Sequence, residues 1–107
     1  MLNDFALLPE HHKLLSSVAA QLMNSSEVVV DSQRISISRV GSDRLRSIRF
    51  FVNNERAIIA IEQNRNKPSR WGKLAKKGHQ VVQFQDVVTK KYLAVVVDGE
   101  VTEYGRR

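Results

Sequence analysis

The connections between the strand-like segments of this chain constrain its fold more than any other feature. Short runs rich in valine, isoleucine and phenylalanine recur along the sequence, and most consecutive runs are two to five residues apart. A link this short returns the chain beside the strand it has just left, so we expect a mainly antiparallel sheet. The predicted strands are Glu27–Val30, Arg34–Val40, Arg44–Val52, Arg56–Gln63, His79–Gln85, Lys91–Val97 and Glu100–Tyr104.

One connection is much longer than the others. Between Gln63 and His79 the chain has room for a helix, and a helical crossover leaves a parallel arrangement of its flanking strands open. The strand before it is apolar on both faces at Ile58–Ile61, which is typical of a central strand.

The region before the first strand is predicted to be a helix from Pro9 to Met23, preceded by a short lead over residues 1–8. A broad apolar stripe recurs there at helical spacing through Leu8, Leu15, Ala19 and Leu22. A stripe of this kind needs a surface to cover, and a sheet is the natural one. We therefore predict a single α+β domain over residues 1–107, with order α-β-β-β-β-α-β-β-β. Its N-terminal helix packs on one sheet face, and residues 105–107 form a frayed tail.

The segment from Lys67 to Phe84 is predicted to be a short helix that runs into a strand. Ser69 can cap the first turn with its hydroxyl, and Gly78 suits the left-handed position that ends a helix, so the helix should span Arg70–Lys77. At about 100° per residue the helix has two unlike sides. The apolar side holds Trp71, Leu74 and Ala75, and the other holds Arg70, Lys73, Lys76 and Lys77.

Gly72 stands in the middle of this helix, where glycine costs about 1 kcal/mol relative to alanine. Two interpretations are open. Either a partner's backbone or a phosphate approaches at Gly72 while the lysines await an anion, or Gly72 relieves crowding near Trp71 and the lysines form a solvated face.

The net charge of +6 is unevenly distributed along the chain. Residues 1–33 carry one cation and four acids, whereas residues 34–107 carry sixteen cations and seven acids. One cluster contains a single acid, Asp43, among Arg34, Arg39, Arg44, Arg46 and Arg49. A second contains no acid among Arg65, Lys67, Arg70, Lys73, Lys76 and Lys77. Clustered positive charge is typical of proteins that contact polyanions.

Signatures of catalysis and of metal binding are not found in the sequence. There is no glycine-rich phosphate loop and no nucleophile elbow, and the adjacent His11 and His12 cannot share a helix face as metal ligands do. The element order outlines the nuclease core that binds magnesium through Asp and Glu-x-Lys. Here Glu62 is followed by Asn64 in the lysine position, and the preceding hairpin has no well-placed aspartate. We therefore expect no catalytic residue, no metal site and no cofactor, and a structural or solvent-facing role for His79.

The chain contains no cysteine, which excludes disulfides and fits a reducing compartment. Its apolar runs are too short to span a bilayer, and its N-terminus lacks the cations of an export signal. We expect a cytoplasmic protein that does not associate with membranes.

Two functions remain open. The first is a non-enzymatic domain that contacts the nucleic-acid phosphate backbone, or another polyanion, without sequence specificity. Its candidate residues are Arg44, Arg46, Arg49, Arg65, Lys67, Arg70, Lys73, Lys76 and Lys77. The alternative is a protein-interaction or homo-oligomeric module, with a homodimer as one form, because Phe51 lies opposite the main apolar face of its strand and two strands are apolar on both sides.

Overall fold

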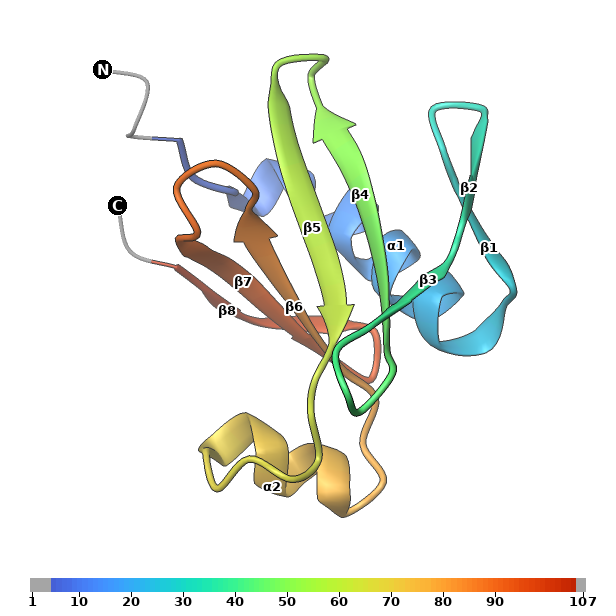
Figure 1. Cartoon of the computed structure of the whole chain (residues 1–107). Helices are drawn as coiled ribbons and strands as arrows, with labels where there is room; N and C mark the ends of the chain where they lie inside the picture. Colours follow the sequence, from blue (N-terminus) through green and yellow to red (C-terminus); the bar gives the residue numbers. More distant parts are fainter. Residues whose placement is uncertain (1–4, 106–107) are drawn as a thin grey trace.

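The computed structural model describes residues 5–105, and within them an antiparallel sheet of six strands, the large sheet, dominates the fold. Its order is β3-β4-β5-β6-β7-β8, and β1 and β2 form a separate hairpin (Figure 1). The helices are a 3-10 turn (Pro9–His11), α1 (His12–Asn24) and α2 (Arg70–Lys76). The strands are β1 (Glu27–Val30), β2 (Gln33–Ser36), β3 (Ser38–Val40), β4 (Leu45–Val52), β5 (Arg56–Glu62), β6 (Val81–Asp86), β7 (Tyr92–Val97) and β8 (Glu100–Tyr104). The predicted α+β class is confirmed. Residues 1–4 of the expected lead and residues 106–107 of the expected tail lie outside the described residues.

The helix α1 covers one face of the large sheet, as predicted (Figure 1). Its first turn is a 3-10 turn, in which the backbone N–H of Leu8 donates to Nδ1 of His11 at 2.9 Å. The stripe that faces the sheet is buried at Leu15, Val18, Ala19 and Leu22. Burial of these side chains, at roughly 1.5–3 kcal/mol for each large one, fixes the helix to the sheet.

The two faces of the large sheet differ because side chains alternate along each strand. In β4, Ile48, Phe50 and Val52 are buried in the core beneath α1, whereas Arg49 and Phe51 are exposed on the opposite face. We call that opposite surface the open face. β5 lies between β4 and β6, so its predicted central position is confirmed.

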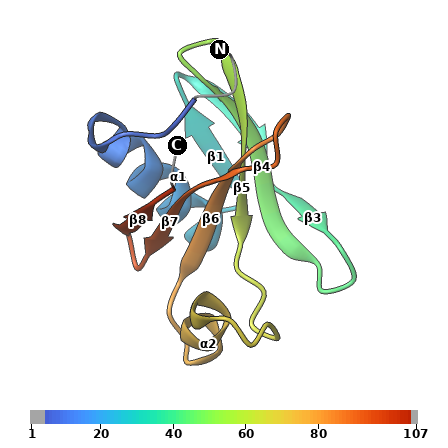
Figure 2. The ribbon, with the colours of Figure 1, turned by 90° about the vertical axis from the view of Figure 1, so that its left-hand side faces the viewer.

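The strands on either side of the crossover, β5 and β6, are not parallel, so the parallel arrangement that the sequence left open is wrong. β5 and β6 are antiparallel, with Ile61 opposite Gln83, and the backbone N–H of Gln63 donates to the Val81 carbonyl at 2.8 Å. A parallel connection must carry the chain back along the whole strand, but α2 has seven residues and stays at one end of the sheet (Figure 2).

The predicted strand Arg34–Val40 is divided into two strands, so five rather than four strands precede α2 in the described residues. The break falls at Ile37. Residues before it pair with β1, which packs on α1, and residues after it pair with β4. Ile35 and Ile37, before and at the break, both pack against the core.

The turn between β6 and β7 is anchored by a buried carboxylate. Asp86 is 1% exposed, its Oδ2 lies 2.6 Å from Nε of Arg56, and its Oδ1 accepts the backbone N–H groups of Val88 and Thr89. Burial by itself would raise the pKa of Asp86, but the hydrogen bonds from Thr89, Arg56 and Val88 outweigh it and lower that pKa below its ordinary value.

Asp86→Asn should lower the free energy of unfolding at pH 7 by about 2 kcal/mol, because a charge-assisted hydrogen bond with Arg56 is lost. A carboxylate whose pKa is depressed on folding contributes stability above its unfolded pKa, near 3.9, and loses it as pH falls through the folded pKa. Urea unfolding at pH 7 and at pH 3 should therefore show a smaller acid-induced loss in the variant. Equal losses would contradict this role for Asp86.

Candidate functional site

The two cationic clusters of the sequence meet at one end of the large sheet. The β3–β4 turn, the β5–α2 loop and α2 all lie at this end (Figures 1 and 2). The side chain of Asp43 in the turn accepts hydrogen bonds from Nδ2 of Asn64 at 2.8 Å and from Nδ2 of Asn66 at 3.2 Å in the loop. Amide hydrogen bonds to the Asp43 carboxylate therefore join two segments that both carry positive charge.

The junction forms a hollow of about 270 Å³, which we call the basic pocket. Four arginines line it, Arg39, Arg44, Arg46 and Arg65, and they outnumber its two acids, Asp43 and Glu62. Arg39 donates to the Arg44 carbonyl at 3.1 Å, which leaves that carbonyl satisfied and holds the turn. Within the described part of the chain, no ion pair joins Arg44 or Arg65 to an acid, and both side chains belong to exposed residues.

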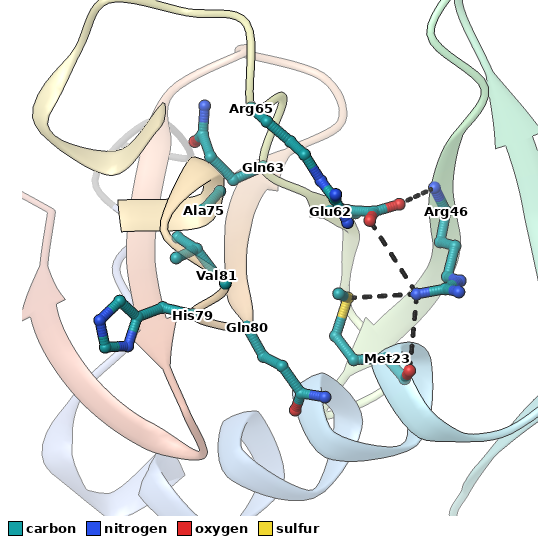
Figure 3. Close-up of a pocket in the computed structure, with 10 residues that line it drawn as sticks. Met23, Arg46, Glu62, Gln63, Arg65, Ala75, His79, Gln80 and Val81 are labelled. Atoms are coloured by element: carbon teal, nitrogen blue, oxygen red, sulfur yellow. Dashed lines mark hydrogen bonds and ion pairs between the residues drawn. The ribbon is translucent and has the colours of Figure 1, made fainter. Parts of the chain in front are cut away.

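Arg46 stands between the basic pocket and a second hollow of about 200 Å³ beside it (Figure 3). Its guanidinium is 3.9 Å from the carboxylate of Glu62 and 3.5 Å from the Met23 carbonyl, and its backbone N–H donates to Glu62 at 3.0 Å. In Figure 3, Arg46 and Arg65 enter the hollow from opposite sides. Arg46 is thus fixed by the fold and joins the C-terminal end of α1 to β4.

The two sides of α2 are as predicted. Ser69 Oγ accepts the Gly72 N–H at 3.2 Å, and Trp71, Leu74 and Ala75 pack with Val81 and Val95 on the open face of the large sheet. Gly78 closes the helix with φ +104°. The cations Arg70, Lys73, Lys76 and Lys77 are exposed, and no ion pair among residues 5–105 includes any of them.

The interpretation of Gly72 is decided by this chain's own backbone. A Cβ at Gly72 would overlap the carbonyl group of Lys67, so glycine lets the β5–α2 loop fold closely onto the helix. The group that approaches Gly72 is the Lys67 carbonyl of the loop. The glycine is therefore explained without a partner or a phosphate at this position.

Not all the candidate cations are brought together. Arg44, Arg46 and Arg65 line the basic pocket, and Lys67 lies on the adjoining part of the loop, whereas the α2 cations share this end of the sheet without lining it. Arg49 lies apart, beside Phe51 in a hollow of about 480 Å³ next to the β1–β2 hairpin. Arg39 belongs to the basic pocket and was missing from the candidate set, although its place in the first arginine cluster was a usable signal.

A second surface was not anticipated from the sequence. A hollow of about 520 Å³, which we call the sheet groove, lies on the open face between the large sheet and the β5–α2 loop. Its apolar part is formed by Leu45, Ile61 and Pro68, and its amides are those of Gln63, Gln83, Gln85 and Asn64. The alternation of Gln83 and Gln85 with Val82 and Phe84 was the available signal for a polar, accessible face.

The histidine near this end has a structural contact. Nδ1 of His79 lies 2.7 Å from Oδ2 of Asp98 in the β7–β8 turn, and the backbone N–H of Gln80 donates to the same carboxylate. The hydrogen bond with His79, and to a lesser extent the one from Gln80, lowers the pKa of Asp98 below its ordinary value. The contact joins the chain after α2 to the β7–β8 turn.

Neither a metal site nor a membrane helix is evident. Across residues 5–105, no three side chains of the His, Cys, Asp and Glu types form a group suited to a metal ion. The described helices are all too short or too polar to cross a bilayer. Comparison of the chain with protein-family models, with curated proteins and with solved structures gives no match.

Gly72→Ala should destabilise the protein by about 2 kcal/mol, because a methyl group would push against the Lys67 carbonyl. Helix propensity alone predicts the opposite sign, a gain of about 1 kcal/mol. Trp71, the only tryptophan, reports on α2 through its fluorescence during urea unfolding. Lys73→Ala, on the exposed side of the same helix, should stay within about 0.5 kcal/mol of wild type. A more stable Gly72→Ala protein would contradict the close packing of loop and helix.

Proposed function

We propose that this protein is a non-enzymatic binding domain that contacts the phosphate backbone of nucleic acids through the cationic end of the large sheet, without sequence specificity. The observation that carries the proposal is the meeting of Arg44, Arg65 and Lys67 with the cations of α2 at one end of the fold. These side chains are exposed and form no ion pair within the described residues.

At this end of the fold the described cations outnumber the described acids, which are Asp43, Glu62 and Asp98. Glu27 pairs with Arg34 on the β1–β2 hairpin at 3.6 Å, and Asp86 pairs with Arg56 near the opposite end of the large sheet. Glu62 pairs with Arg46 and Asp98 lies against His79, whereas Asp43 keeps its negative charge because the two amides that donate to it are neutral. A net excess of exposed cations is the charge pattern that releases counterions when it meets a phosphate backbone.

The chemistry of the cluster also limits the kind of recognition. Guanidinium and ammonium groups on a turn, a loop and a short helix contact phosphates, whereas sequence is read by side chains that enter a groove of the duplex. The absence of catalytic activity stays a prediction. A cytoplasmic location stays a prediction.

The proposal predicts salt-sensitive binding that depends on this end of the molecule. A labelled DNA duplex titrated at about 50–200 mM salt should bind with a log–log slope near −0.9 per phosphate contacted. The double variant Arg44→Ala/Arg65→Ala should lose about tenfold in affinity and flatten the slope by about two contacts.

The matched control removes two cations elsewhere. Lys13 lies on α1 and Lys91 follows the β6–β7 turn, and both are exposed. Lys13→Ala/Lys91→Ala should bind nearly as wild type does. Equal losses in the two double variants would mean that net charge alone attracts the nucleic acid, and absence of wild-type binding at low salt would refute the proposal.

A second candidate function, protein association, is favoured by a different observation. β4 has eight residues, but β3 pairs only with residues 45–47. Backbone groups of alternate residues point to opposite edges of a strand, and the N–H of Arg46 points toward Glu62 of β5. The backbone N–H and C=O groups of Arg49 and Phe51 therefore point to the outer edge of β4, where no strand among residues 5–105 pairs with them.

An outer edge of this kind is a template for a strand from another chain. Phe51, 58% exposed, lies on it, and the hollow that separates it from the β1–β2 hairpin leaves room beside it. A second copy of this chain is the simplest partner, and it would make the protein a homodimer.

Light scattering separates this candidate from a monomer of 12.2 kDa. If β4 edges associate, wild type should have about twice the monomer mass, and Phe51→Lys should return it to the monomer. Val88→Lys provides the control, because Val88 is an exposed valine of the β6–β7 turn, away from the β4 edge. A monomeric wild type at high concentration would exclude the homodimer.

A further inference from the structure

The sheet groove and the basic pocket share a wall. Leu45, Glu62, Gln63 and Asn64 line both, and Lys67 lies on the rim of the groove. A surface for a planar, hydrogen-bonding group therefore adjoins a surface for an anion. A nucleotide unit has these two parts, a base and a phosphate, at a fixed separation.

We propose that the sheet groove seats an unpaired base of a single-stranded nucleic acid whose phosphates lie on the basic pocket. The inference rests on the proposed function and deepens it by naming the strand state of the ligand. The groove volume of about 520 Å³ falls within the range of roughly 300–1,000 Å³ found for small-ligand sites.

The apolar part of the groove suits the face of a base. Ile61 stands on the open face of β5, with Leu45 from β4 and Pro68 from the β5–α2 loop also on the lining. Ile61 is opposite Ser47 of β4 on one side and Gln83 of β6 on the other, so polar and apolar groups alternate across the sheet at this level. A base resting here contacts side chains of both kinds.

The side-chain amides of the groove form a row of hydrogen bonds, the ladder, in which each amide donates to the next. Nε2 of Gln85 donates to Oε1 of Gln83 at 3.4 Å, Nε2 of Gln83 donates to Oε1 of Gln63, and Nε2 of Gln63 donates to the Asn64 carbonyl at 3.2 Å. Each amide nitrogen has a second N–H, which this ladder does not use. Gln63 is 7% exposed and anchors the ladder, whereas Gln83 and Gln85 are half-buried and accessible.

Gln85 is the open end of the ladder. No described residue donates a hydrogen bond to its Oε1, so its amide offers an acceptor beside a donor. A glutamine amide with both groups available matches the edge of a base, as in the paired hydrogen bonds that glutamine makes with adenine. The ladder holds this amide in place at the moment of binding.

Whether the ligand is single-stranded or a duplex follows from whether its bases can reach the groove. In a duplex the bases are stacked and paired inside the helix, and a groove on a sheet face cannot receive them. A single strand can turn a base outward while its phosphates stay on the neighbouring cations. We therefore expect single-stranded DNA or RNA to bind in preference to a duplex of the same sequence.

The test compares a labelled 15-nucleotide single strand, as DNA and as RNA, with the matching DNA duplex by fluorescence anisotropy at low salt. Gln85→Leu keeps a side chain of similar size and removes the amide at the end of the ladder. It should lower single-strand affinity about tenfold, leave duplex affinity unchanged and leave the salt slope unchanged. Gln33→Leu, an exposed glutamine on β2, is the control and should alter neither affinity.

The outcomes separate this inference from the function on which it rests. If Arg44→Ala/Arg65→Ala weakens both ligands while the single strand has no advantage and Gln85→Leu has no selective effect, the groove proposal fails and phosphate binding stands. If neither ligand binds wild type, both proposals fail. If polyglutamate released the labelled strand as readily from wild type as from Gln85→Leu, the role of the groove would also be overturned, since the base would then add nothing to charge.

A strand without bases gives a further control that does not depend on the fold of a variant. An abasic oligonucleotide of equal length should bind wild type about tenfold more weakly than the normal strand, and it should bind Gln85→Leu with the same affinity as wild type. Equal binding of abasic and normal strands by wild type would overturn the proposal.

Discussion

Burial of the α1 stripe against one face of the large sheet is the constraint on which the rest of the structure depends. Leu15, Val18 and Leu22 are wholly removed from solvent there, with the buried side chains of the central strands opposite them. The chain has one long helix for this purpose, and α2 covers only part of the other face, at Val81 and Val95. The remainder of the open face is left accessible, which is why Ile61 and its neighbouring amides line a groove rather than a core.

The cationic end depends on a different balance. Like charges repel, yet Arg44 and Arg65 lie in one pocket because the turn and the loop that hold them are joined by hydrogen bonds from Asn64 and Asn66 to Asp43. Packing of the Lys67 carbonyl against Gly72 then sets the loop on α2. Hydrogen bonds to the Asp43 carboxylate and packing of the loop backbone thus position Arg44 and Arg65, whose side chains stay exposed.

Local patterns predicted most of the elements correctly. Period-two alternation placed Ile48 and Phe50 opposite Phe51, and helical spacing placed Trp71 and Leu74 on the packing side of α2. The bend at Ile37 was not predicted, although the alternation changes phase there, with Ile35 and Ile37 before it and Val40 as the next apolar residue. That strand is divided because its two halves pair with different strands, the first with β1 and the second with β4.

The sequence by itself determined the α+β class, the antiparallel hairpins, the cap and closure of α2 at Ser69 and Gly78, and the presence of two cationic clusters. These features depend on residues close together in the chain, whose geometry is fixed by short-range sterics and hydrogen bonds. Only the tertiary structure decided that Asp43 meets Asn64 and Asn66, that Arg49 lies apart, and that Gln63, Gln83 and Gln85 form one ladder. Those contacts join residues from separate strands and loops. The distances between them are set by strand pairing across the sheet, and no local pattern specifies that pairing.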